Sequence, residues 1–358
     1  MPMIANSQRG VALLTILLLV VSITVVAGAM LASQKIAIRR SSLLFDQNQL
    51  LQDINTGQQL ALTIIRADDE LNDTDSMQDI WAQPLPPYTL DRHSIGIEVR
   101  DEAGRFNINN LYHHGAVDTA ALAVFQQLLT QLNVEPDIAI AILDYQDTDS
   151  EVYQDGGDES VVYNQQSSGS VDKNLANQAF VSVDQLEEVK GVNAEVLALL
   201  RPYITVVPYY LPININTASP VLLAALIDGA TSKQMQAVID LREKQAFTSV
   251  DDVWQLPILS GLNEEQRKAI TPLLAVDSQA FMALITASDN ATVGQARQRF
   301  ATIVISKMAT DDERESSNNN NGRNDNNSAN NATNDDKNKT PKDIKVVTQR
   351  LWAFRPVF

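Results

Sequence analysis

The sequence predicts an α+β fold in which a long N-terminal helix precedes an antiparallel sheet, with a large all-α domain inserted between the strands. Three observations carry this prediction. An apolar run near the N-terminus continues into a segment with helical spacing, β-rich segments flank residues 106–276, and residues 106–276 contain an internal repeat. Because strands lie on both sides of the repeat, the helical block interrupts a sheet domain rather than following it.

The apolar run at residues 11–34 carries no charge and would span about 36 Å as a helix, enough for a hydrocarbon core of about 30 Å. A secretory signal cleaved after Ala27-Gly28-Ala29 is the alternative, but such signals use an apolar stretch of only about 7–15 residues. Beyond Lys35, apolar residues keep helical spacing at Leu43, Leu50, Ile54, Ala61 and Ile65. We therefore expect a transmembrane helix at 11–34 and an amphipathic continuation at 35–66.

The short polar leader that ends in Arg9-Gly10, followed by this helix, resembles the type IV prepilin family. The resemblance implies a leader at residues 1–10, cleavage by a prepilin peptidase after Gly10, and methylation of the new N-terminal residue, Val11. The three basic residues beyond the run outnumber Arg9 and the amino terminus before it, which opposes the usual charge rule for membrane orientation. The leader resemblance outweighs this.

The fifth mature position distinguishes this chain from most pilins, which carry Glu there, because this chain has Thr15. In the family, that carboxylate pairs with the N-terminal amine of the subunit added before it, and a charge in lipid is costly unless it is paired. An uncharged residue therefore suits a subunit with no neighbour above it. Within pilin-like proteins, this absence resembles the type II secretion system protein K family, whose members are minor pseudopilins at the pseudopilus tip.

Composition limits the chemistry available to the chain. It has 358 residues and no cysteine, which excludes disulfides, thiolate zinc sites and thiol nucleophiles. Its formal net charge is −17 at pH 7, which argues against a partner that is itself a polyanion.

Alternating or β-rich segments occur at 95–99 before the helical block and at 281–286, 299–306 and 346–354 after it. We expect sheet regions at 67–105, 277–309 and 343–358. The same plan is found in protein K, where a helical domain interrupts a pilin-like sheet that packs on the N-terminal helix. Residues 310–342 hold eleven Asn and almost no apolar residues, which predicts a disordered loop.

The block at 106–276 consists of two related units. Phe106-Asn107-Ile108-Asn109 matches Ile213-Asn214-Ile215-Asn216, and the Phe-x-Ser-Val-Asp segment at 180–184 matches that at 247–251. We expect the second Asn of each motif, or Thr217, to cap the helix that follows.

Seven carboxylates lie between Asp144 and Glu159, with no Lys or Arg until Lys173. Such crowding is repulsive unless a cation sits among them, and Ca²⁺ prefers six to eight oxygen ligands from flexible acidic loops. A solvated acidic loop is the alternative. The segment resembles the acidic, calcium-binding part of protein K, and this resemblance implies a structural Ca²⁺ site at Asp144, Asp147, Asp149, Asp155, Asp158 and Glu159.

Two other functions fit the sequence less well. Helix-hairpin-helix DNA-binding proteins contain similar motifs, but residues 106–276 hold 8 Lys and Arg against 22 Asp and Glu, which would repel phosphate. The chain contains three histidines and none of the common nucleophile, nucleotide or metalloprotease motifs, so we do not expect an enzyme.

The sequence therefore predicts a minor pseudopilin that is anchored in the inner membrane, with most of the chain in the periplasm. The resemblance implies other minor pseudopilins of types I, J and H, the prepilin peptidase and the inner-membrane assembly platform as partners, and no nucleic acid. A minor pilin of a type IV pilus and a membrane-tethered DNA receptor are the alternatives.

Overall fold

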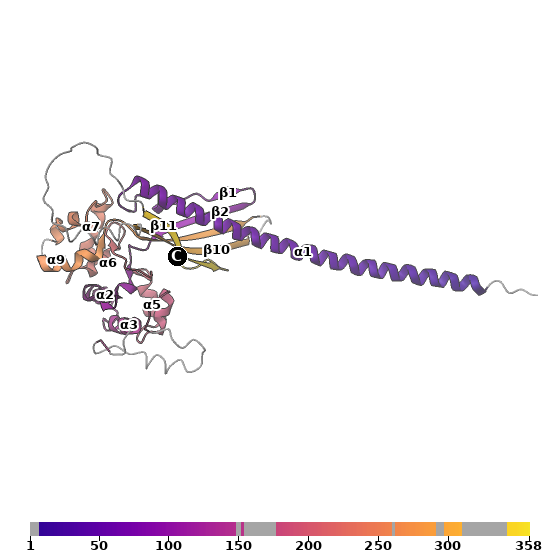
Figure 1. Cartoon of the computed structure of the whole chain (residues 1–358), viewed down its shortest axis with the longest axis horizontal. Coiled ribbons are helices and arrows are strands. Elements are labelled where there is room, and N and C mark those ends of the chain that lie inside the picture. The colour runs from indigo at the N-terminus through magenta and orange to yellow at the C-terminus, as the bar shows by residue number, and fades with distance from the viewer. Residues whose placement is uncertain (1–6, 148–151, 154–176, 260–261, 291–296, 310–341) are drawn as a thin grey trace, which may run out of the picture.

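The computed structural model describes residues 7–147, 152–153, 177–259, 262–290, 297–309 and 342–358. Figure 1 shows a long helix that projects from a folded body, and the body contains a sheet and a helical region. Residues 1–6 of the expected leader and 310–341 of the Asn-rich segment lie outside the described residues.

The projecting helix, α1 (Ser7–Leu71), is continuous over 65 residues. It is long and apolar enough to cross a membrane. Its later half packs on the sheet through Leu50, Ile54 and Ile65, which are at most 3% exposed. Leu43 shares their spacing but is 43% exposed, because it precedes the level at which the body first contacts the helix, near Asp46.

The sheet has five antiparallel strands in the order β1-β2-β9-β10-β11. Their bounds are β1 (Tyr88–Leu90), β2 (His93–Asp101), β9 (Ala280–Asp289), β10 (Arg297–Ala309) and β11 (Lys342–Trp352). The central pairs are Ile97 opposite Ile285 and Ile285 opposite Ala301. This confirms the predicted antiparallel sheet, which is built from strands on both sides of the helical block.

One face of the sheet is covered by α1, and the alternating apolar residues of β9 and β10 form the core between them. The short helix η1 (Ile80–Ala82) adds Trp81, whose ring lies edge-on 5.1 Å from that of Phe281. Helix and sheet approach each other closely at Gly57, where an added Cβ atom would lie 2.5 Å from Cγ2 of Ile285. A larger residue at this position would require the Ile285 side chain, the helix or the strand to shift.

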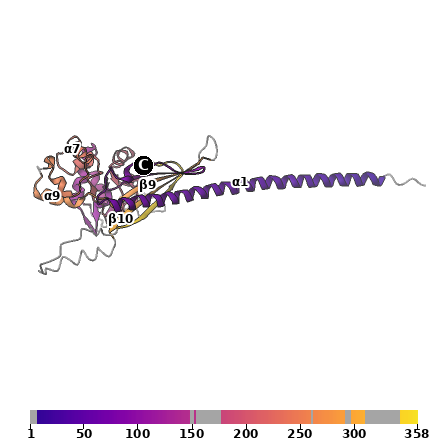
Figure 2. The same ribbon diagram turned by 90° about the horizontal axis from the view of Figure 1, so that it is seen from above.

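The helical block, hereafter the insert, leaves the sheet after β2 and returns to it at β9. It occupies the end of the body remote from the apolar part of α1 (Figures 1 and 2). Its first part contains β3 (Phe106–Asn107), η2 (Ile108–Asn110), β4 (Tyr112–His113), β5 (Ala116–Val117), α2 (Thr119–Gln131), α3 (Ile138–Gln146), η3 (Val183–Glu188), α5 (Ala194–Leu200) and β6 (Ile204–Thr205). Its second part contains β7 (Ile213–Asn214), α6 (Pro220–Ala225), α7 (Ser232–Arg242), α8 (Val250–Trp254), η4 (Pro257–Leu259), α9 (Glu264–Ile270), η5 (Thr271–Leu273) and β8 (Leu274–Ala275).

The internal repeat is present as a structural repeat. In each unit the first strand pairs in parallel with the last, β3 with β6 and β7 with β8, over two residues. These short pairs and the β4–β5 hairpin were not predicted by the all-helical interpretation of the insert. Two-residue strands have no recognisable period in a sequence, which is why they were missed.

The expected capping role of the second Asn in each repeat is wrong. Asn109 instead exchanges two hydrogen bonds with the backbone of Phe180, and Asn216 does the same with Phe247, at 2.8–3.0 Å. The following helices α2 and α6 begin later in the chain and are capped by Asp118 and Ser219. A side-chain amide carries both a donor and an acceptor. It can therefore bond to both the C=O and the N–H of one buried residue, as a neighbouring strand would.

Candidate functional site

The residues expected to be processed lie within α1, which already begins at Ser7. Gly10 and Val11 are helical, and Val11 is 65% exposed, as are most apolar side chains of the projecting part. The hydroxyl of Thr15 donates a hydrogen bond to the Ala12 carbonyl at 2.9 Å. Thr15 is uncharged, and its hydroxyl donates a hydrogen bond within its own helix, so it requires no partner on a neighbouring subunit.

The insert joins the sheet through two consecutive carboxylates at the end of β2, Asp101 and Glu102, which are 6% and 1% exposed. Asp101 accepts hydrogen bonds from the hydroxyls of Thr217 in the second unit and Ser278 at the exit of the insert, the latter at 2.6 Å. Glu102 accepts one from Thr205 in the first unit at 2.5 Å. Each carboxylate therefore connects the sheet to a different unit.

Asp101 is almost completely buried at this point. Burial raises the pKa of its carboxyl to about 7, although the hydrogen bonds from Ser278 and Thr217 oppose the rise. Asn214 also reaches this region and donates to the Ser278 hydroxyl at 2.7 Å and to the Asp75 carbonyl at 2.9 Å. The first Asn of the second repeat thus contacts the sheet domain rather than its own helices.

A buried ion pair completes the junction between sheet and insert. Nζ of Lys307 on β10 lies 2.6 Å from Oδ2 of Asp75, in the loop after α1, and the two side chains are 3% and 1% exposed. The same oxygen accepts the Ser278 N–H at 2.7 Å. Helix, sheet and insert therefore meet at one carboxylate.

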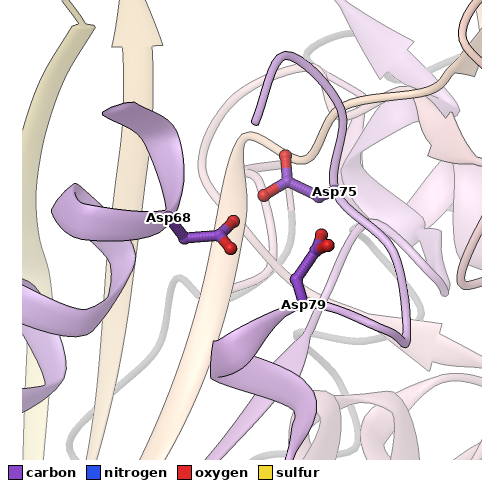
Figure 3. Close-up of side chains that lie close together, drawn as sticks. All are labelled: Asp68, Asp75 and Asp79. Atoms are coloured by element: carbon purple, nitrogen blue, oxygen red, sulfur yellow. The ribbon is translucent and has the colours of Figure 1, made fainter. Parts of the chain in front are cut away.

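Asp75 also belongs to a group of three carboxylates with Asp68 and Asp79, whose nearest oxygens all lie within 4.8 Å of one another (Figure 3). Burial and the nearby charge of Asp79 raise the pKa of Asp68 to about 6. Asp79 accepts hydrogen bonds from Ser76. The Lys307 ammonium, which pairs with Asp75, and the Asn72 amide, which donates to Asp68 at 3.0 Å, offset the repulsion in this group, so we assign it to the junction.

The predicted calcium ligands are described only in part, because Asp149, Asp155, Asp158 and Glu159 lie outside the described residues. Asp144 and Asp147 lie at the C-terminal end of α3 and are 0% and 3% exposed. Oδ1 of Asp144 accepts the Tyr153 N–H at 3.1 Å. Two of the predicted ligands are thus buried carboxylates at the end of the same helix.

The sequence alone did not indicate the junction residues Lys307, Asp75 and Asp101, nor the role of Gly57. The available signals were weak: a lysine in an apolar strand, and two acidic residues that end a strand where the sheet meets the insert. Neither signal indicates which residues pair with each other, because Lys307 and Asp75 are separated by 232 positions.

A long apolar N-terminal helix packed on an antiparallel sheet, with a two-unit insert between the strands, defines a pilin-like protein with an inserted domain. Two family models, both described as type II secretion system protein K, match residues 104–209 and 213–277. The boundary between the two matches falls between the two repeat units of the insert.

Relatives support the same assignment. Protein K of Pseudomonas aeruginosa is 30% identical over 258 residues, which cover 69% of this chain and 76% of the relative. Protein K of Klebsiella pneumoniae is 28% identical over 293 residues, 78% of this chain and 87% of the relative. The chain belongs to the type II secretion system protein K family.

A solved structure has the same fold. The crystal structure of the GspK-GspI-GspJ complex from the enterotoxigenic Escherichia coli type 2 secretion system contains a chain that matches with a TM-score of 0.68 at 20% identity. The match covers 87% of this chain and 99% of that chain. The fold, including the insert between β2 and β9, is therefore shared at low sequence identity.

Proposed function

We propose that this minor pseudopilin occupies the tip of the type II secretion pseudopilus and nucleates its assembly with other minor pseudopilins, for protein export across the outer membrane. The observation that carries the proposal is the uncharged Thr15, whose hydroxyl bonds to its own helix. A subunit inside the fibre needs a carboxylate at this position for the amine of the subunit added before it, whereas the subunit at the tip has no such neighbour.

The position of the insert supports the same proposal. It lies at the end of the body remote from the apolar part of α1 (Figure 2). Subunits with such an insert would not stack closely above one another along a tightly wound fibre. The insert is compatible with the end of the fibre, where no further subunit has to be accommodated.

The partners of this function are other minor pseudopilins. The solved relative is a complex with GspI and GspJ, and we propose that this chain assembles with proteins of types I, J and H. The part of α1 between the apolar run and the body carries exposed apolar residues, such as Leu44 and Phe45 at 62% and 65% exposure. These side chains suit contact with the helices of those subunits. The prepilin peptidase would process the leader, the inner-membrane platform would support assembly, and the role is mechanical rather than enzymatic.

We further propose that the acidic segment of the insert binds a structural Ca²⁺. The described residues of this segment support the proposal. Asp144 and Asp147 are buried at the C-terminal end of a helix, where the helix dipole disfavours anions, and buried carboxylates are costly unless a cation balances them. Between them, Gln146 is 2% exposed, and its Oε1 has no hydrogen-bond donor among the described residues. Carboxylate and amide oxygens are the ligands that Ca²⁺ prefers.

The tip assignment is tested by labelling the protein on isolated pseudopili. Labels at one end of each fibre are expected, and uniform labelling along the fibres would contradict the tip position. Thr15→Glu is expected to give no gain in secretion, because no amine is available to pair with the new carboxylate. A pull-down from solubilised membranes should recover the other minor pseudopilins, and their absence would contradict the proposed partners.

A further inference from the structure

The acidic and basic residues of this chain are unevenly distributed. All 44 Asp and Glu lie from Asp46 onward, together with 23 of the 27 Lys and Arg. The first 45 residues contain only basic charges, and three of these four lie directly after the apolar run, at Lys35, Arg39 and Arg40. We call these three residues the basic collar.

The basic collar is exposed and lies on the bare part of α1. All three side chains are exposed in the structure. The first acidic residue along the helix is Asp46, which forms ion pairs with Arg92 at 3.4 Å and with Arg297. No acidic residue of α1 below the body is therefore available to neutralise the collar.

The collar lies at the level of lipid headgroups once the apolar run spans a bilayer. Residues 11–34 span about 36 Å, slightly more than the hydrocarbon core of about 30 Å. Arg40 lies only about 7.5 Å beyond Lys35 along the axis, which is close to the thickness of one headgroup layer. At 100° per residue the three side chains occupy an arc of roughly 140° around the helix, and long basic side chains can extend toward phosphates.

The surrounding side chains suit the same environment. Ile36 and Ile38 are 55% and 71% exposed within the collar. A segment of a spanning helix that combines exposed aliphatic residues with long basic side chains suits the boundary between hydrocarbon and headgroups, because the aliphatic parts lie in the apolar layer and the charges reach the headgroups.

We infer that the basic collar binds anionic phospholipid headgroups on the side of the membrane that faces the folded body. This inference rests on the proposed membrane anchor. The interaction stabilises the subunit at a fixed depth in the bilayer, and it must be broken when the subunit is withdrawn into a fibre. A basic residue near an anionic surface contributes about 1 kcal/mol, which corresponds to roughly a fivefold preference for each side chain.

The absence of cysteine allows a direct test with the full chain. Ser42→Cys places one unique thiol beside the collar for a donor fluorophore. The labelled chain is reconstituted in phosphatidylcholine vesicles with 20% or no phosphatidylglycerol, and a trace of acceptor-labelled phosphatidylglycerol or phosphatidylcholine is added. We expect severalfold enrichment of the anionic lipid around the donor, and a decrease in this enrichment at high salt.

The variants separate the collar from general charge effects. Lys35→Gln/Arg39→Gln/Arg40→Gln should make transfer to the two labelled lipids equal. The matched control Lys233→Gln/Lys244→Gln, at two exposed sites of the insert, should leave the enrichment unchanged. Equal transfer in the unsubstituted chain, or enrichment that survives the triple substitution, overturns the inference.

Two further outcomes distinguish this inference from the proposed function. If the chain resists alkaline extraction from vesicles but shows no lipid preference, the anchor stands and the collar inference fails. If the triple variant then also loses the other minor pseudopilins in a pull-down, the collar is assigned to a protein contact. A chain that does not integrate into vesicles at all overturns the anchor and, with it, the collar.

Discussion

The ammonium of Lys307 lies 2.6 Å from Oδ2 of Asp75, and both side chains are almost completely buried. This pair connects β10 to the loop after α1, at the oxygen that also accepts the backbone N–H of Ser278. Because Ser278 lies where the insert returns to the sheet, the pair fixes the position of the insert relative to the long helix.

Removing one partner of this pair should therefore strongly destabilise the protein. Lys307→Met should lower the free energy of unfolding by about 3–5 kcal/mol, because the buried Asp75 carboxylate is left without its partner. Asp75→Asn should cost less, because Asp69 still lies 3.6 Å from the Lys307 ammonium. The double variant should lose less than the sum of the two. Lys345→Ala, which removes an exposed pair with Asp343, should cost at most about 1 kcal/mol in the same denaturant titration of the detergent-solubilised chain. Additive losses would show that the two side chains are not coupled.

The raised pKa values at the junction predict that protonation stabilises it. The pKa of Asp68 is raised from 3.8 to about 6 and that of Asp101 to about 7. The folded state therefore binds these protons more tightly than the unfolded state does. The stabilisation is complete below about pH 4 and is lost as the pH rises through 6 and 7.

Thermal unfolding at pH 5 and pH 8 measures this dependence. The contribution of each group is the difference between the unsubstituted chain and its Asn variant, because many other carboxylates also titrate. Asp68→Asn should reduce the loss of stability between the two pH values. An unchanged or steeper loss would contradict the assigned role of Asp68.

The close approach of helix and sheet at Gly57 predicts that adding one methyl group at this position destabilises the protein. Gly57→Ala places Cβ 2.5 Å from Cγ2 of Ile285, and overpacking of this kind costs about 1–3 kcal/mol. The helical preference of Ala offsets about 1 kcal/mol of that cost. Gly28→Ala is the matched control in the same helix, since no atom lies within 4 Å of its new Cβ. Equal stability of the two variants would contradict the close contact.

Processing is predicted at the Gly10–Val11 bond. Intact-mass measurement of the membrane-extracted protein should show a chain that begins with methylated Val11. Gly10→Ala should block this maturation and leave the leader attached. A mature chain that begins at Met30, after Ala27-Gly28-Ala29, would instead identify a cleaved secretory signal and contradict both the anchor and the pilin-like assembly.

Calcium should stabilise the insert. An ion that binds only the folded state contributes about 2.7 kcal/mol at a concentration one hundred times its dissociation constant. The melting temperature should therefore be higher in Ca²⁺ than in chelator, and Mg²⁺ should substitute poorly because it requires a tighter octahedral site. Asp149→Ala should remove most of the difference, whereas Glu187→Ala, at an exposed site of η3, should not. Equal melting with and without calcium would favour the solvated acidic loop.

Local patterns in the sequence determined the large features of this protein. The apolar run and the spacing of Leu50, Ile54 and Ile65 indicate one long helix, and α1 confirms it. The repeated Asn-Ile-Asn motif identifies two related units, which the parallel pairs β3–β6 and β7–β8 show in three dimensions. Periodicity and repetition are properties of neighbouring residues, so they can be recognised before the chain is folded.

Only the tertiary structure decided how these parts are joined. Asparagine is a preferred helix-capping residue. In the fold, however, Asn109 and Asn216 lie beside the backbone of phenylalanines that are 71 and 31 residues away, respectively. Lys307 meets Asp75 across 232 residues, and Gly57 lies close against Ile285. Such contacts leave no local pattern, since their free energy depends on burial and on partners that are distant in the sequence.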